Sequence, residues 1–178
     1  MALWVFGYGS LLWNPGFEVA EQAVATLHGW HRSFCMSSIH HRGTEEHPGL
    51  VLALDAADQA FCHGLALRVK PGTEEAAIKE LRERELVSSA YLERELSVTL
   101  RDGREITTVT YVIDPHHVQY IHLSLEEQAK VISTAIGGRG PNTEYLYNTA
   151  AHLLELGIQD EELDWLSARV RELTAQMQ

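Results

Sequence analysis

The chain has 178 residues, 45% of them hydrophobic, and a net charge of −11 from 14 basic and 25 acidic side chains. This length is typical of one domain with a sizeable core, so we expect a single domain over residues 1–178. The ordinary balance of apolar and charged residues excludes a disordered or fibrous chain, and the acidic charge argues against nucleic acids and anionic membranes as partners.

The N-terminus and the cysteines predict a cytoplasmic protein. A signal peptide needs a positive start, whereas no charged residue precedes Glu18, and Gly7 and Gly9 interrupt the apolar run. Cys35 and Cys62 allow at most one disulfide, too few for a stapled secreted scaffold. No apolar run reaches the roughly 18 residues that a membrane span needs. We therefore expect reduced thiols and no membrane segment.

Before about residue 115, short apolar or β-branched runs alternate with turn residues, a pattern typical of strands. The predicted strands cover residues 3–6, 24–38, 50–55, 61–69, 96–100 and 105–113. Asp55–Asp58 predicts a hairpin loop, and Asp102-Gly103 is a strong hairpin signal.

Helices are predicted at 74–86, with Thr73 as N-cap, and throughout the part of the chain after residue 115. The later helices begin at a capping box opened by Ser124, at Asn142 or Thr143, and at Asp160, and the first two end at Gly137-Gly138 and Gly157. These elements predict an α+β fold in which an antiparallel sheet or small barrel packs against helices.

The first candidate for chemistry is the segment from Gly7 to Leu12, directly after a buried strand. Two glycines let the backbone turn sharply, and successive N–H groups in such a loop can bind an anion or an oxyanion. The alternative is an ordinary turn. The segment is not a dinucleotide-binding motif, because it lacks the third glycine and no helical pattern follows it.

The second candidate is Glu85. Helical spacing places it on one face with Ala77 and Leu81, whereas Glu83 points away with the neighbouring arginines. A carboxylate on a core-facing stripe has its charged form disfavoured, which raises its pKa toward a value useful for a general base. The alternative is a helix-end glutamate paired with Arg84 or with an arginine on another strand.

A third candidate is the glycine-rich segment 137–146, where the N–H groups at the start of a helix, together with Arg139, could hold a carboxylate. The alternative is a flexible interhelical loop, in which the glycines end one helix and Asn142 or Thr143 caps the next. The ten histidines lack the spacing of a metal site, so we expect no bound metal. Ser10 lacks the G-x-S-x-G motif that surrounds the nucleophilic serine of many hydrolases.

Four motifs together resemble the ChaC family of glutathione-specific γ-glutamylcyclotransferases. They are VFGYGSLLW at 5–13, HRG at 41–43, RE at 84–85 followed by Tyr91, and GRGPNTEYL at 138–146. Their order and spacing make the match specific from about residue 3 to residue 155.

The resemblance implies a small, mostly antiparallel β-barrel flanked by helices, and an enzyme that releases 5-oxoproline from glutathione and leaves cysteinylglycine without a cofactor. It assigns the catalytic role to Glu85. The substrate contacts that it implies are Gly7, Tyr8, Gly9, Ser10, Leu11, Leu12 and Tyr145. The chain departs from the family at His63 and Leu67, which bears on how narrowly it selects glutathione.

Alternative functions remain open at this point. The same chemistry could act on other γ-glutamyl amino acids or amines, because only the leaving-group pocket would differ. A non-catalytic metabolite-binding domain and a histidine-rich metal-handling protein are further alternatives. Because glutathione is an anion and the chain is acidic, local cations are needed, and Arg42 and Arg139 are the candidates.

Overall fold

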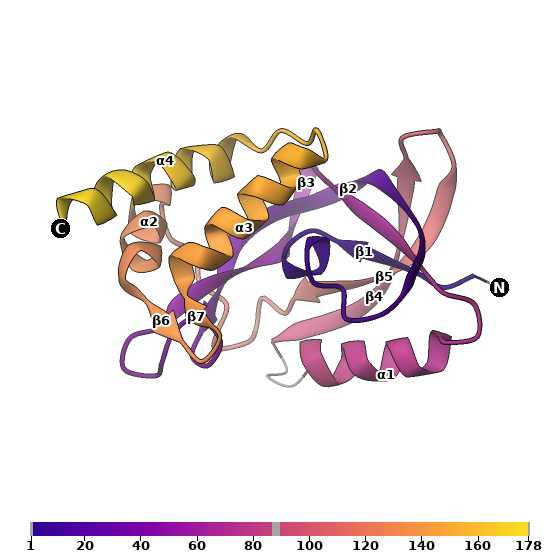
Figure 1. Ribbon diagram of the computed structural model, residues 1–178, viewed down its shortest axis with the longest axis horizontal. Helices are drawn as coiled ribbons and strands as arrows, with labels where there is room; N and C mark the ends of the chain where they lie inside the picture. Colours follow the sequence, from indigo (N-terminus) through magenta and orange to yellow (C-terminus); the bar gives the residue numbers. More distant parts are fainter. Residues whose placement is uncertain (1, 87–89, 178) are drawn as a thin grey trace. The chain divides into compact units, whose positions relative to one another are not determined.

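The computed structural model describes residues 2–86 and 90–177, and Figure 1 shows its elements. The strands are β1 (Trp4–Gly7), β2 (Val19–Ser38), β3 (Gly49–Val69), β4 (Tyr91–Leu100), β5 (Glu105–Ile113), β6 (Ile136–Gly137) and β7 (Gly140–Pro141). The helices are the short 3-10 helix η1 (Ser10–Leu12) and α1 (Glu74–Glu85), α2 (Leu125–Thr134), α3 (Asn142–Glu155) and α4 (Glu161–Gln176).

Five strands form a closed barrel in the order β1-β3-β2-β4-β5. β1 runs antiparallel to β3, β2 to β4 and β4 to β5, and a parallel pair between Val5 and Val109 closes the barrel. This confirms the predicted α+β fold with a small, mostly antiparallel barrel. No helix among the described residues is long and apolar enough to cross a membrane.

The chain divides into two compact units. Unit 1 contains Met1–Ser33 and Ala53–His117, and unit 2 contains Phe34–Leu52 and Val118–Gln178. β2 and β3 each contribute residues to both units, because the boundaries fall inside these two long strands.

The predicted hairpin loop at Asp55–Asp58 is wrong, because β3 runs without a break through it. The side chains at 55–58 alternate between half-buried and exposed, as expected for a strand with one face toward solvent. Gln59 has a φ of 65°, a local irregularity that the strand accommodates. Pairing with neighbouring strands overrides the turn preference of two aspartates.

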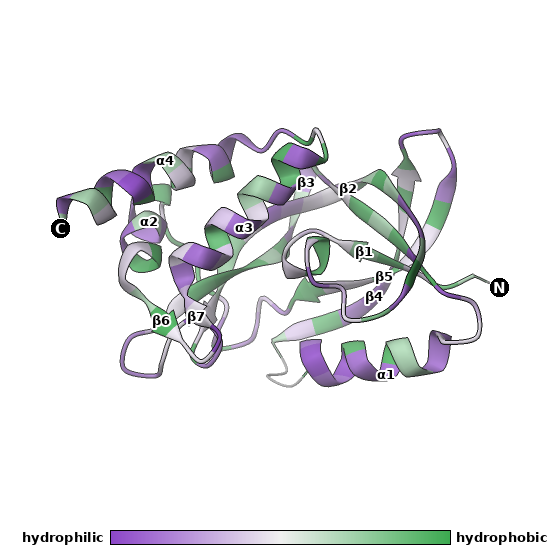
Figure 2. Ribbon diagram, viewed as in Figure 1, coloured by the Kyte–Doolittle hydropathy of each residue, from purple (hydrophilic) through white to green (hydrophobic). Residues whose placement is uncertain are grey.

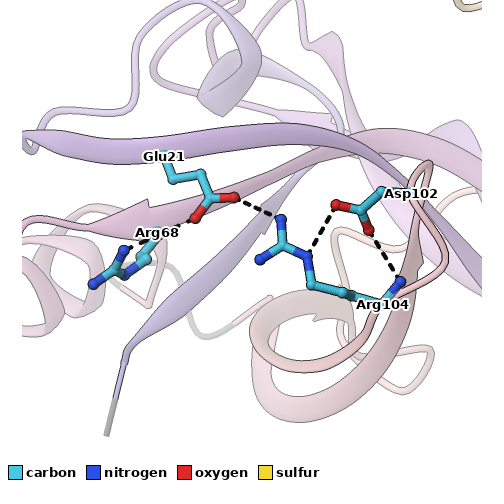
Figure 3. Close-up of polar contacts among 4 residues, drawn as sticks. All are labelled: Glu21, Arg68, Asp102 and Arg104. Carbon is cyan, nitrogen blue, oxygen red and sulfur yellow. Dashed lines mark hydrogen bonds and ion pairs between the residues drawn. The ribbon is translucent and has the colours of Figure 1, made fainter.

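The hairpin between β4 and β5 forms where Asp102-Gly103 predicts it. Gly103 has a φ of 97°, a conformation that favours glycine, and the Leu100 N–H donates to Arg104 O at 2.8 Å. Figure 3 shows the charged side chains that join this turn to β2 and β3. Arg104 donates to Asp102 at 2.9 Å and to Glu21 at 2.6 Å, and Glu21 also lies 3.8 Å from Arg68. These side chains are at least one-third exposed, so each pair contributes little alone.

In unit 1, α1, η1 and the barrel strands together form a hydrophobic cluster. Its members are Val5, Leu11, Val69, Ala77, Leu81 and Tyr111. Hydrophobic and hydrophilic residues alternate along α1 in Figure 2, as expected for a helix with one buried face. Thr73 is the N-cap residue as predicted, but its side chain makes no capping bond and its hydroxyl donates to Lys70 O instead.

In unit 2, two of the three predicted helix starts are confirmed. Ser124 opens α2 with a complete capping box, and the side chain of Asp160 caps α4 by accepting from the Leu163 N–H. The third start is wrong, because Pro141 is the N-cap of α3 and Asn142 already lies in the helix. The Asn142 side chain instead exchanges two hydrogen bonds of 2.8 Å with the backbone of Leu50.

The segment between α2 and α3 is not a plain interhelical loop. α2 ends at Thr134, before the predicted stop at Gly137-Gly138, and β6 and β7 then form a small ribbon. A Cβ on Gly137 would collide with the backbone of residues 41–43, so glycine is needed there for close packing. The Gly138 and Arg139 N–H groups donate to the carbonyls of His40 and His41.

Candidate active site

The glycine loop directly follows β1. Gly7 ends the strand, and η1 begins at Ser10. A Cβ on Gly7 would lie 3.1 Å from the Leu11 Cβ, so the tight turn favours glycine. The Leu12 N–H donates to Gly9 O at 2.9 Å and is therefore committed to the turn itself.

Two side chains anchor the loop at Tyr8. The Tyr8 hydroxyl donates to the carbonyl of Tyr111 on β5 at 2.6 Å. The guanidinium of Arg32, on β2, donates to Tyr8 O at 3.1 Å and to His63 O at 2.8 Å. Tyr8 and Arg32 are both buried. The loop is therefore held from two strands of the barrel, β5 and β2, and Arg32 is itself bonded to β3.

Glu85 lies at the end of α1 on its inner face, as predicted. Ala77 and Leu81 are buried, the Glu85 side chain is 14% exposed, and Glu83 is exposed. Helical periodicity therefore predicted correctly which of the two glutamates is shielded from solvent. A carboxylate at this position is partly removed from water and lies beside the cluster that contains Tyr111.

Arg84 connects Glu85 to the glycine loop. Its guanidinium donates to the Ser10 hydroxyl at 2.9 Å and to Asn14 O at 2.6 Å, and its Nε lies 3.5 Å from Glu85 Oε1. The prediction that the neighbouring arginines point away from the core face is wrong for Arg84, because its long side chain reaches around the helix end to the loop. The structure thus brings together two motifs that are far apart in the sequence.

A second polar group lies on the barrel beside α1. Arg82 makes two hydrogen bonds of 3.0 Å to the carboxylate of Glu93, which also accepts from the Tyr111 hydroxyl at 2.9 Å. These bonds, with that from Arg82 the stronger cause, hold the pKa of Glu93 below its usual value. Burial raises the pKa of Tyr111, and the negative charges of Glu93 and Glu85 raise it further.

His63, one of the two departures from the family pattern, lies on β3. Its Nδ1 is 2.8 Å from the Thr26 hydroxyl, and its ring contacts Phe61. Burial lowers the pKa of His63, and the positive charge of Arg32 lowers it further. We therefore expect a neutral imidazole at this position at neutral pH.

Tyr145 lies on α3, in unit 2, whereas the loop and Glu85 lie in unit 1. Its ring is buried and packs edge-on against Phe34, and its hydroxyl accepts from the Leu52 N–H at 3.1 Å. Arg42 lies over the same ring, 5.7 Å from its centre. Within its own unit, Tyr145 therefore supports the packing of α3 on β2 and β3.

The two arginines proposed for substrate binding have different surroundings within unit 2. Arg42 is buried, donates to Pro141 O at 3.0 Å and lies 3.5 Å from Glu144. Arg139 is exposed, in the turn between β6 and β7. Much of the Arg42 charge is therefore balanced locally, whereas Arg139 faces solvent.

Sequence reasoning missed Arg32 and Arg84 as the side chains that hold the loop. For Arg32 a signal was available, because it is a single arginine that lies two residues before the buried apolar run Phe34–Met36 in β2. Nothing in the sequence shows which way the side chain of Arg84 turns. Among residues 2–86 and 90–177, no three His, Cys, Asp or Glu side chains gather in a group that could hold a metal ion.

Comparisons with known proteins agree with this architecture. A family model described as ChaC-like protein matches residues 3–173. The chain is 37% identical over 175 residues to the glutathione-specific gamma-glutamylcyclotransferase of Escherichia coli (strain K12), covering 98% of this chain and 75% of that protein. It is 32% identical over 183 residues to gamma-glutamylcyclotransferase 2-3 of Arabidopsis thaliana, covering 99% of this chain and 92% of that protein.

A crystal structure from yeast, of a γ-glutamyl cyclotransferase specific to glutathione, superposes with a TM-score of 0.87. The two chains are 23% identical and the match covers 96% of each, which supports the shared fold. Because the family model spans almost the whole sequence and the curated relatives match it nearly end to end, the chain belongs to the ChaC-like protein family.

Proposed function

We propose that this chain is a γ-glutamylcyclotransferase that converts glutathione to 5-oxoproline and cysteinylglycine. The observation that carries the proposal is the contact of Arg84 with both Ser10 and Glu85, which places the glycine loop beside the carboxylate. The names of the Escherichia coli and Arabidopsis thaliana relatives support the same activity.

The proposed reaction closes a ring within the γ-glutamyl unit of the substrate. Glu85 removes a proton from the α-ammonium group, and the resulting amine attacks the γ-carbonyl carbon. The C–N bond to cysteine then breaks as Glu85 returns its proton to the departing nitrogen. The second proton of the ring nitrogen passes to the same departing amine, which leaves as the ammonium group of cysteinylglycine, and the lactam keeps one N–H. No water, redox change or cofactor is needed, because nucleophile and electrophile belong to one molecule that the enzyme holds in attack geometry. A single base of this kind is typically worth about 10²–10⁴-fold in rate.

The glycine loop supplies the remaining interactions in this proposal. The backbone N–H groups of Tyr8–Leu11 stabilise the negative charge that gathers on the γ-carbonyl oxygen. Gly7 and Leu12 shape the loop at its two ends, and the Ser10 hydroxyl donates to the α-carboxylate. We also propose that Tyr145 lines the pocket, and that Arg42 and Arg139 supply positive charge for the glycine carboxylate of glutathione.

The test is to incubate purified protein with glutathione and to quantify both products, alongside Glu85→Gln. The variant keeps the shape of the side chain and removes the base, so we expect kcat to fall by at least about 100-fold. Wild type should form 5-oxoproline and cysteinylglycine in equal amounts.

Glu83→Gln is the matched control, since it changes an exposed glutamate on the same helix. We expect this variant to retain activity within about twofold. Near-normal turnover by a correctly folded Glu85→Gln would contradict the proposed base, and absence of both products with wild type would contradict glutathione as the substrate.

A second candidate keeps the reaction and changes the leaving group. His63, at which the chain departs from the family pattern, and the Arabidopsis thaliana relative, whose name specifies no glutathione, both support it. A panel of glutathione, γ-glutamylalanine and γ-glutamyl-lysine separates the alternatives. A kcat/KM for either of the latter above that for glutathione would favour this candidate.

We also propose a cytoplasmic location with no nucleic acid or membrane as partner. The supporting observations are the net charge of −11 and the two buried cysteines, which are not joined by a disulfide.

A further inference from the structure

We propose that Arg84 is a positioning residue that makes the Ser10 hydroxyl a directed hydrogen-bond donor and fixes the Glu85 carboxylate beside it. The inference rests on the proposed function and adds a specific task for a side chain to which neither the resemblance nor the comparisons assign a role.

The guanidinium of Arg84 contacts three different groups. One terminal nitrogen donates to Asn14 O, the other donates to the Ser10 hydroxyl, and Nε faces Glu85 Oε1. The side chain is only 18% exposed, so these contacts are partly shielded from water. A Cβ on Gly16 would lie 3.4 Å from the same guanidinium, so the loop also packs closely around it. A planar, permanently charged fork suits this arrangement better than a lysine would.

The bond from Arg84 determines what Ser10 can offer to a ligand. A serine hydroxyl has one hydrogen and two acceptor positions. Because the Arg84 N–H occupies one acceptor position, the Ser10 hydrogen is directed away from the guanidinium. The adjacent positive charge also polarises the hydroxyl and strengthens it as a donor. Ser10 is therefore prepared to bind an anionic oxygen, and we assign to it the α-carboxylate of the γ-glutamyl unit.

The remaining contacts of Arg84 tie the loop to the base. Asn14 follows η1, so its carbonyl fixes the far end of the loop to α1. The ion pair with Glu85 at 3.5 Å restrains the carboxylate on the side of Ser10. Arg84 therefore acts through two partners, and the two effects fall on different kinetic constants. The contact with Ser10 serves substrate binding and is read in KM, whereas the contact with Glu85 serves proton transfer and is read in kcat.

A double-mutant cycle between Arg84 and Ser10 separates the two effects. Ser10→Ala should raise KM about tenfold, the loss of one hydrogen bond to a charged group, with kcat little changed. Arg84→Gln should raise KM by a similar factor and also lower kcat about tenfold. In the Ser10→Ala background, Arg84→Gln should no longer raise KM and should still lower kcat.

Two further variants distinguish positioning from a general loss of structure. Arg84→Lys keeps the charge but cannot form all three contacts, so its KM and kcat should lie between wild type and Arg84→Gln. Arg82→Gln is the matched control on the same helix, because Arg82 pairs with Glu93 and not with the loop. It should change both constants by less than about twofold.

Hydrogen exchange tests the inference without substrate. The N–H groups of Leu12, Trp13 and Asn14 are bonded to Gly9 O or Ser10 O within the loop. They should exchange at least about tenfold faster in Arg84→Gln and at the wild-type rate in Arg82→Gln.

The inference would be overturned if Arg84→Gln left the hydrogen-exchange rates of these N–H groups unchanged. It would also be overturned if Arg84→Gln raised KM as much in the Ser10→Ala background as in wild type. If wild type leaves glutathione intact, the proposed function is wrong, and the exchange rates still decide whether Arg84 holds the loop.

Discussion

The carboxylate of Glu93 accepts hydrogen bonds from two donors on different elements, Arg82 on α1 and the Tyr111 hydroxyl on β5. Because these bonds favour its charged form, the pKa of Glu93 lies below its usual value of 4.5. A carboxylate with a lowered pKa in the folded state stabilises the fold at neutral pH. That stabilisation is lost as the pH falls through the lowered value.

We therefore expect Glu93→Gln to lower the urea midpoint at pH 7 and to have a smaller effect at pH 3, because below pH 4.5 the unfolded-state carboxyl is protonated and part of the stabilisation by Glu93 is lost. Urea unfolding of both proteins at the two pH values is the measurement. Glu95→Gln, on an exposed residue of the same strand, serves as control. A difference that is as large at pH 3 as at pH 7 would refute the assignment.

At the scale of elements, Asn142 joins the first turn of α3 to the start of β3. Its side chain is fully buried and satisfies both the N–H and the carbonyl of Leu50. Asn142→Ala leaves both backbone groups without these partners, so we expect a loss of about 2–4 kcal/mol in the free energy of unfolding. Asp160→Ala removes one helix cap and should cost only about 1 kcal/mol. Denaturant unfolding measures the free energy of unfolding of both variants, and we expect the larger loss for Asn142→Ala. Equal losses for Asn142→Ala and Asp160→Ala would contradict this prediction.

Some elements could be predicted from sequence because local geometry decides them. The turn at Asp102-Gly103 and the capping box at Ser124 formed as expected, since each contains its own hydrogen-bond partners. The segment Asp55–Asp58 did not form its predicted loop, because pairing with other strands holds it extended. Sequence alone does not show whether such a partner is present.

Within the candidate site, the residues with local sequence signals could likewise be predicted, and those that depend on distant partners could not. Glu85 could be placed from helical spacing, and the loop from its glycines, because both signals are local. Arg84 could not, since a long side chain at a helix end can turn toward solvent or toward the loop. The sequence predicts a helix cap at Asn142 or Thr143 and not the bond from Asn142 to Leu50, because Leu50 is distant in sequence.

At the scale of the whole molecule, we propose that residues 1–178 fold as a single domain. The chain forms two compact units, but β2 and β3 run continuously through both. Unfolding one unit would therefore have to break two strands in the middle. We expect one cooperative transition, in which peptides from β5 in unit 1 and from α3 in unit 2 lose protection against hydrogen exchange at the same urea concentration. Midpoints that differ by more than about 0.5 M would show that the units unfold separately.

The closure of the barrel by Val5 and Val109 also has a consequence for biosynthesis. Synthesis proceeds from the N-terminus, so β1 leaves the ribosome long before β5 exists, an interval on the order of ten seconds at typical elongation rates. During that time the growing sheet has an open edge, the kind of surface that pairs with other chains. We therefore expect this edge to be a target for chaperones until β5 emerges and pairs with β1.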